Sequence, residues 1–188
     1  MNTRNTIISP CGLYRYTLWR DWRHEPSPLC RDCADFGPTC PHSGGPCDTS
    51  KYVVFIGLNP STADATKDDH TVRKCIGFAK QWGYRSMCIV NLFAFRATQP
   101  SDLFKATNPI GPGNNYHFLS VISDADLVIA AWGNQSNPAL AARLKTLKRA
   151  AIIKLLRTAQ CLGYTASGQP LHPSRPGYLT KRVPFSFA

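Results

Sequence analysis

Two asparagines accompany apolar runs of the sequence, one just after a run and one within a run, where a side chain can meet a ligand. Residues 52–56 form a β-branched and aromatic run that stops at Gly57, and Asn59 and Pro60 follow it. Because proline fixes its own φ and keeps the preceding residue out of the helical region, we expect a buried strand that ends in a rigid loop. Asn91 lies inside a second apolar run. A buried amide has to be hydrogen-bonded, either by the protein or by a ligand that it reads.

Strands and helices alternate along most of the chain, which predicts an α/β fold. The apolar spacing over 68–82 indicates a helix, with acids at its start and Gly83 at its end. Further strands are expected at 13–20 (at a sheet edge), 87–93, 126–132 and 160–164, further helices at 114–122 and 138–157, and a loop at 96–113. This order favours a mainly parallel central sheet covered by helices on both faces. In such folds ligands bind at the carboxyl ends of the strands.

The length and composition bound what the protein is. The 188 residues suffice for one domain, 1–188, and 43% of them are hydrophobic. No run reaches the roughly 18 apolar residues of a membrane span, and the polar start is not typical of a signal peptide, so we expect a cytoplasmic protein that does not bind a membrane. We expect a monomer, although the sequence leaves the oligomeric state open.

Charge is distributed unevenly, which favours an anionic partner. The net charge is +11, and no Asp or Glu follows Asp126. The residues after Asp126 carry nine basic side chains, which are Arg143, Lys145, Lys148, Arg149, Lys154, Arg157, Arg175, Lys181 and Arg182. Nucleic acid phosphates are the simplest partner for such a surface, while solubility or an acidic protein partner are the alternatives.

A Cys-rich insertion interrupts the α/β pattern at 24–50. It contains four cysteines, Cys30, Cys33, Cys40 and Cys47, in a segment rich in proline and glycine. The close first pair can chelate one ion, and flexible spacers let the second pair complete a tetrahedron, which predicts Zn²⁺ or a [4Fe-4S] cluster. Disulfides are less favoured in a cytoplasmic protein. The other cysteines, Cys11, Cys75, Cys88 and Cys161, have apolar neighbours that predict core positions, with the alternative that Cys11 reaches the four-cysteine cluster.

Four motifs in the same order resemble the uracil-DNA glycosylase superfamily, including its mismatch-specific and thymine-DNA-glycosylase-like relatives. They are Gly57-Leu58-Asn59-Pro60, the run from Ile89 through Asn91 to Arg96, Trp132-Gly133 after a strand, and His172-Pro173-Ser174 near the C-terminus. Asn59 to Asp64 reads Asn-Pro-Ser-Thr-Ala-Asp, as in a little-studied branch of that group. The resemblance extends over roughly residues 51–181 without the Cys-rich insertion. It implies a three-layer α/β/α fold and a DNA glycosylase.

The resemblance implies roles that fit the chemistry of the residues. A glycosylase extrudes the nucleotide and binds the bare base. Gly57, Leu58, Ser61, Asn91 and Phe93 are implied to bind the base, since the Asn91 amide both donates and accepts. His172 is implied to stabilise the negative charge of the leaving base, and Asn59 to orient the attacking water, because an amide is no general base. Ser174, Arg175, Lys181 and Arg182 are implied to contact the DNA backbone.

Ser61 directs the substrate prediction. Classical uracil enzymes carry a tyrosine at the matching place, which excludes a C5 substituent, and Ser61 leaves room there. We therefore expect a uracil-like, mismatched or C5-modified pyrimidine of thymine size or larger, in double- or single-stranded DNA. The chemistry itself needs no cofactor. A non-catalytic DNA-binding module with a decayed pocket, and an enzyme that processes nucleosides or nucleotides, are the alternatives.

Overall fold

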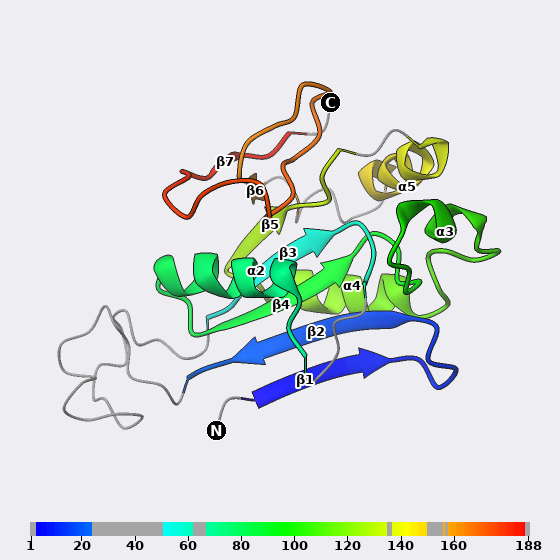
Figure 1. The fold of residues 1–188 in the computed structure, drawn as a ribbon, viewed down its shortest axis with the longest axis horizontal. Helices are drawn as coiled ribbons and strands as arrows, with labels where there is room; N and C mark the ends of the chain where they lie inside the picture. Colours follow the sequence, from blue (N-terminus) through cyan, green and yellow to red (C-terminus); the bar gives the residue numbers. More distant parts are fainter. Residues whose placement is uncertain are drawn as a thin grey trace.

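The computed structural model describes residues 3–23, 51–61, 67–134, 137–149, 156 and 158–186. One sheet of seven strands runs through these residues in the order β1-β2-β4-β3-β5-β6-β7 (Figure 1). The strands are β1 Thr3–Ile8, β2 Arg15–Asp21, β3 Val53–Gly57, β4 Ser86–Asn91, β5 Leu127–Ala130, β6 Gln160–Cys161 and β7 Val183–Pro184. The helices are α2 His70–Gln81, α3 Pro100–Lys105, α4 Asn114–Ser123 and α5 Pro138–Arg149.

The centre of the sheet is parallel and its two sides are antiparallel. Strand β3 pairs in parallel with β4 and β5, and β5 pairs in parallel with β6. Strands β1 and β2, β2 and β4, and β6 and β7 pair in antiparallel fashion. The predicted α/β class is confirmed, with a mixed sheet. Because β3, β4 and β5 are parallel, their carboxyl ends meet at one edge.

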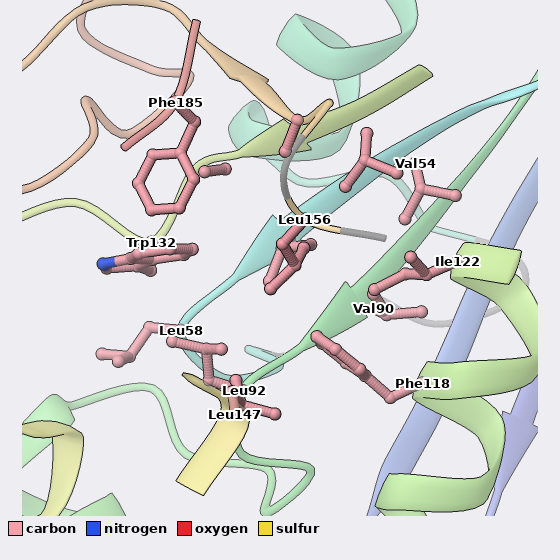
Figure 2. Packing of buried hydrophobic residues seen from close by; sticks show 14 of the residues in the cluster. Val54, Leu58, Val90, Leu92, Phe118, Ile122, Trp132, Leu147, Leu156 and Phe185 are labelled. Atoms are coloured by element: carbon pink, nitrogen blue, oxygen red, sulfur yellow. The ribbon is translucent and has the colours of Figure 1, made fainter. Parts of the chain in front are cut away.

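Alternate residues of the buried strands feed two separate core clusters. Val53 and Phe55 of β3 join the cluster that includes Phe78 of α2. Val54 and Ile56 point the other way and join the cluster that contains side chains of α4 and α5. Figure 2 shows this second cluster, with Val54, Val90, Phe118, Ile122 and Leu156 among the labelled side chains. The period of two along β3 therefore places helices against both faces of the sheet.

Helix α2 lies inside the predicted range 68–82 and is shorter by two residues at its start and one at its end. Asp69 caps it, since a carboxylate oxygen of Asp69 accepts the Val72 backbone N–H at 2.8 Å. Gly83 follows the last turn with a φ of 83°, a conformation that favours glycine. The cap matters for function because it fixes Asp69 at the carboxyl edge of the sheet.

Four elements differ from the sequence prediction, namely β1, β2, α3 and β7. The strand at 13–20 was expected at a sheet edge, which is wrong, because β1 pairs with β2 on its outer side. The polar alternation of β1 carries little hydrophobic pattern from which to predict it. The loop at 96–113 contains the short helix α3, and the chain adds β7 after the last predicted strand.

The cysteines divide into two groups. Cys75, Cys88 and Cys161 are buried as predicted, whereas Cys11 is exposed, so its predicted core position is wrong. The four predicted metal ligands, Cys30, Cys33, Cys40 and Cys47, lie outside the described residues. Across the described ranges, no group of three or more His, Cys, Asp or Glu side chains is placed to hold a metal ion. None of the helices built from those ranges is long and apolar enough to cross a membrane.

Candidate active site at the carboxyl edge of the sheet

A cavity of about 210 Å³ opens where β3, β4 and β5 end. It brings together six of the residues that the sequence singled out, which are Gly57, Leu58, Asn59, Ser61, Asn91 and His172. The sheet therefore gathers groups that are up to 115 positions apart in the sequence (57 to 172). Their hydrogen bonds decide which atoms remain for a ligand.

Asn59 is held by its amide nitrogen. Its Nδ2 donates to the backbone oxygen of Ala97 at 2.7 Å and to that of Pro60 at 3.1 Å. Both partners are acceptors, so the amide orientation is fixed, with Nδ2 on the side of the carbonyl groups. The Oδ1 atom faces away from those two contacts. Asn59 can therefore offer the cavity an acceptor, which is the group that orients a water molecule.

Asn91 is buried with an unused donor. Its side chain is 2% exposed, and its Nδ2 has no hydrogen-bond partner among the described residues. A Cβ on Gly57 would lie 2.6 Å from Asn91 Oδ1, so only glycine leaves the Asn91 amide its place. A buried donor without a partner costs roughly 1–3 kcal/mol, which a ligand acceptor would recover. This is the feature of the cavity that most directly indicates a ligand.

His172 is oriented by its own loop. Its Nδ1 accepts the Ser174 backbone N–H at 3.4 Å and lies 2.8 Å from Ser174 Oγ. Because Nδ1 accepts from a backbone donor, the ring proton of neutral His172 belongs on Nε2, where it can be donated to a ligand. Burial lowers the pKa of His172, against an opposing effect of Asp69. Gly133, with a φ of 77°, leaves room for His172, whose Cβ lies 3.1 Å from the position of a Cβ there.

Ser61 connects the Asn59 loop to α2. Ser61 Oγ donates to Asp69 Oδ2 at 2.5 Å, while Asp69 Oδ1 caps α2. The capping role expected for the acids before α2 is confirmed for Asp69, which also lines the cavity. Asp68 instead forms an ion pair with Arg20 at 2.6 Å. The small Ser61 side chain thus lines the cavity, and its hydrogen bond to Asp69 fixes this part of the cavity wall.

Several lining residues were missed by the sequence analysis. Phe55 and Trp132 form aromatic walls, and Arg15 of β2 adds a guanidinium that is 3% exposed. Burial lowers the pKa of Arg15 to about 10, so it stays charged at neutral pH. Trp132 is fixed by its Nε1, which donates to Gln169 Oε1 at 2.9 Å. Phe55 and Trp132 lay in a predicted strand and in the motif Trp132-Gly133, but neither was assigned to the site, and nothing in the sequence indicated Arg15.

The other predicted site residues lie outside the cavity. Phe93 is 1% exposed in the core and packs edge-on against Phe104. Ser174 holds His172, as described above. Arg175 is exposed next to that loop, whereas Lys181 and Arg182 lie beside the C-terminal end of α2, where the Arg182 guanidinium covers the Trp82 ring at 4.7 Å.

Comparison with protein families gives one match. Residues 45–174 match the family described as "Protein of unknown function (DUF1643)", which is more than half of the 188 residues. The chain belongs to this family. Comparison with curated proteins and with solved structures finds no match. The DUF1643 match extends from before β3 to Ser174, so it includes every cavity residue except Arg15.

Proposed function

We propose that this DUF1643 protein is a DNA glycosylase that flips a uracil-like, mismatched or C5-modified pyrimidine out of DNA and hydrolyses its N-glycosidic bond. The observation that carries the proposal is the buried, unpartnered Nδ2 of Asn91, a residue that lines the same cavity as Asn59 and His172. The order of the motifs and the helices on both faces of the sheet agree with the three-layer α/β/α arrangement of the uracil-DNA glycosylase superfamily.

The size of the cavity suits a bare base. Its volume of about 210 Å³ leaves room for a pyrimidine ring. This agrees with a base that enters the pocket while its phosphates stay outside. Because Ser61 is small, the wall beside Asn59 leaves room for a methyl or larger C5 group.

Asn91 and His172 would bind and stabilise the leaving base. Asn91 Nδ2 would donate to a ring oxygen, which gives the buried amide its missing partner. When the glycosidic bond breaks, the base leaves with negative charge, and the Nε2–H group of His172 would donate a hydrogen bond to the base oxygen where that charge develops. The lowered pKa of His172 keeps the ring neutral near pH 7, with one proton to donate.

Asn59 would orient the attacking water. Because its Nδ2 is bound to Ala97 and Pro60, its Oδ1 remains to accept a hydrogen bond from water and direct the oxygen toward the sugar. An amide removes no proton, so we expect a slow enzyme. An aspartate at this position would place a carboxylate oxygen beside the Ala97 carbonyl oxygen, and the two would repel each other. Replacing Asn59 by aspartate alone is therefore not expected to give a faster enzyme.

The charged and Cys-rich parts supply the remaining proposals. Arg175, Lys181 and Arg182 would contact DNA phosphates, and Ser174 would act there only through His172, since its hydroxyl is engaged. Cys30, Cys33, Cys40 and Cys47 would hold Zn²⁺ or a [4Fe-4S] cluster, because four thiolates suit either. Metal analysis with a visible spectrum separates the two, since only the cluster is coloured. We propose a cytoplasmic location.

The test is base release from defined oligonucleotides. Duplex and single-stranded substrates that contain uracil, a thymine mismatch or a C5-modified pyrimidine are incubated with the protein, and abasic sites are cleaved by mild alkali and counted. We expect abasic sites with the wild type and none above background with Asn59→Ala or His172→Ala.

The same experiment distinguishes the alternatives. Tight binding to these oligonucleotides without abasic product would indicate a DNA-binding module with an inactive pocket. Release of base from free nucleosides or nucleotides, but not from oligonucleotides, would indicate a nucleoside-processing enzyme. Either result would overturn the proposed glycosylase.

A further inference from the structure

The end of β4 is held from two sides, and one side consists of side chains that the proposed chemistry does not use. The β4 ladder with β3 ends at the pair Gly57 and Asn91. Beyond it, the backbone N–H of Leu92 donates to Gly57 O at 3.0 Å, and that of Phe93 donates to Leu58 O at 2.9 Å. Strand β3 thereby fixes the donor side of the peptides that follow Asn91.

The acceptor side of the same peptides is fixed by Asn114, the first residue of α4. Its Nδ2 donates to Asn91 O at 3.1 Å and to Leu92 O at 3.2 Å, and the residue is 0% exposed. Arg143 of α5 adds a third contact, from its Nε to Leu92 O at 3.0 Å. Two helices therefore contribute side chains whose hydrogen bonds go to the backbone that carries Asn91.

These two side chains cost folding free energy, which indicates that they serve a function. Asn114 Oδ1 and Arg143 Nη2 are buried without a hydrogen-bond partner among the described residues. Arg143 is 3% exposed, and burial lowers its pKa to about 10, so it remains a buried cation at neutral pH. Buried amides and cations are kept at a cost when an apolar pair would pack as well. Here both act on one point, the backbone that begins at Asn91.

We propose that Asn114, assisted by Arg143, is a positioning residue for Asn91. By holding both carbonyl groups, Asn114 fixes the Asn91 backbone, and the gap at Gly57 then leaves one place for the Asn91 amide. The Asn91 side chain, which lines the cavity, thereby has its orientation set before any ligand arrives. Preorganised donors of this kind bind without reorganisation when the ligand enters. This inference rests on the proposed role of Asn91 in binding the base.

The first test does not depend on activity. Asparagine side-chain N–H signals are recorded by NMR with selective ¹⁵N labelling, and the Asn91 pair is assigned by its loss in Asn91→Ala. We expect the Asn91 signals to shift or broaden in Asn114→Ala and to keep their wild-type positions in Asn115→Ala. Asn115 is the matched control because it is the next residue of α4 and is exposed. Unchanged Asn91 signals in folded Asn114→Ala would overturn the proposal.

A second variant guards against misfolding of Asn114→Ala. Arg143→Met removes the contact to Leu92 O and replaces a buried charge with an apolar side chain of similar length, a change that is often tolerated. We expect the Asn91 signals to move in this variant also. If they stay in place while the protein is folded, the assisting role of Arg143 is wrong.

The third readout uses base release and a double-mutant cycle. We expect Asn114→Ala to lower kcat/KM by about tenfold in the wild-type background and by less than about twofold in Asn91→Ala, because the two residues act through one group. Equal losses in both backgrounds would show a merely structural role and overturn the proposal. Absence of base release with every substrate would overturn the proposed function alone, since the NMR result would still decide how Asn91 is held.

Discussion

The two ends of α2 differ in the surroundings of their polar side chains, which line a cavity at one end and are exposed at the other. At its N-terminal end, Asp69 and His172 line the cavity, where hydrogen bonds with Ser61 and Ser174 fix their side chains. At its C-terminal end, a hollow of about 480 Å³ is lined by Lys181, Arg182 and Trp82, and both basic residues are exposed. The 12 residues of α2 separate the two by about 18 Å at about 1.5 Å per residue.

One segment, residues 172–182, connects these ends. It begins at the cavity with His172, and in its middle Tyr178 packs on Gly77, where a Cβ would lie 2.4 Å from the Tyr178 ring. Lys74 strengthens this contact, with its Nζ 4.2 Å from the ring centre and 2.8 Å from Pro176 O. The difference teaches that Lys181 and Arg182, which follow His172 by about ten residues, lie a helix length away from it, whereas Arg175 stays beside it. In the proposed function, Lys181 and Arg182 would therefore contact phosphate at the end of α2 opposite to the chemistry.

The largest expected effect falls at the cavity end. In single-turnover assays of base release with saturating enzyme, we expect His172→Ala and Asn91→Ala to lower the rate by about 100-fold or more, since each removes a donor to the leaving base. Arg182→Ala, at the other end of α2, is the matched control and should change this rate by less than about threefold. Similar losses in all three variants would remove the functional distinction between the ends.

Two glycines test the same distinction through stability. Gly57→Ala forces a methyl group to 2.6 Å from the buried Asn91 Oδ1, and we expect a loss of about 1–3 kcal/mol in the free energy of unfolding by urea. Gly77→Ala meets Tyr178, which is 43% exposed and can rotate away, while alanine favours the helix by about 1 kcal/mol. We therefore expect a smaller loss at Gly77. A larger loss of unfolding free energy in Gly77→Ala than in Gly57→Ala would contradict the expectation that the cavity end is the more rigid of the two.

Acid should weaken the cavity end through His172. Burial lowers its folded-state pKa below 6.5, so the unfolded chain binds the proton more tightly. Stability from this group is therefore complete above pH 6.5 and is lost as the pH falls from there to the folded pKa. Urea unfolding of the wild type between about pH 7 and pH 5 should show a steeper decline than that of His172→Gln. Identical slopes would mean that His172 titrates normally.

The smallest expected effect falls at the far end of α2. If Lys181 and Arg182 each contact a phosphate, the variant with both changed to alanine should reduce the salt slope of DNA binding by about two. Lys105→Ala is the control, because Lys105 is exposed on α3 and pairs with Asp102 at 3.3 Å. Fluorescence anisotropy at several salt concentrations measures the slopes. An unchanged slope in the double variant would place the DNA elsewhere.

The sequence predicted the elements that carry a strong hydrophobic period. Strands β3, β4 and β5 and helices α2 and α4 lie where apolar spacing placed them, because burial of one face leaves a readable repeat. Strand β1 was missed because its residues alternate without an apolar face. The position of β2 was then predicted wrongly as well. Without β1 in the prediction, β2 had no partner on its outer side and was taken as the edge strand.

The site was predictable as far as it depends on chain order. Asn59 follows β3 and Asn91 ends β4, so their convergence in the cavity agrees with the expectation for parallel strands, and His172 reaches the same edge from the loop after β6. Phe93 was wrongly predicted to bind the base. It lies two residues beyond Asn91, after the last β3–β4 pair, and it packs in the core. Arg15 and Asn114 come from elements whose packing depends on the whole fold, and nothing in their sequence neighbours indicates it.

The most direct test of the central claim is identification of the released base. Oligonucleotides that contain uracil, a thymine mismatch or a C5-modified pyrimidine are incubated with the wild type and with Asn91→Ala, and free bases are measured by mass spectrometry. We predict a free pyrimidine base from the wild type and none above background from Asn91→Ala. No free base from any substrate with folded, DNA-binding wild-type protein, or equal release by both proteins, would contradict the account.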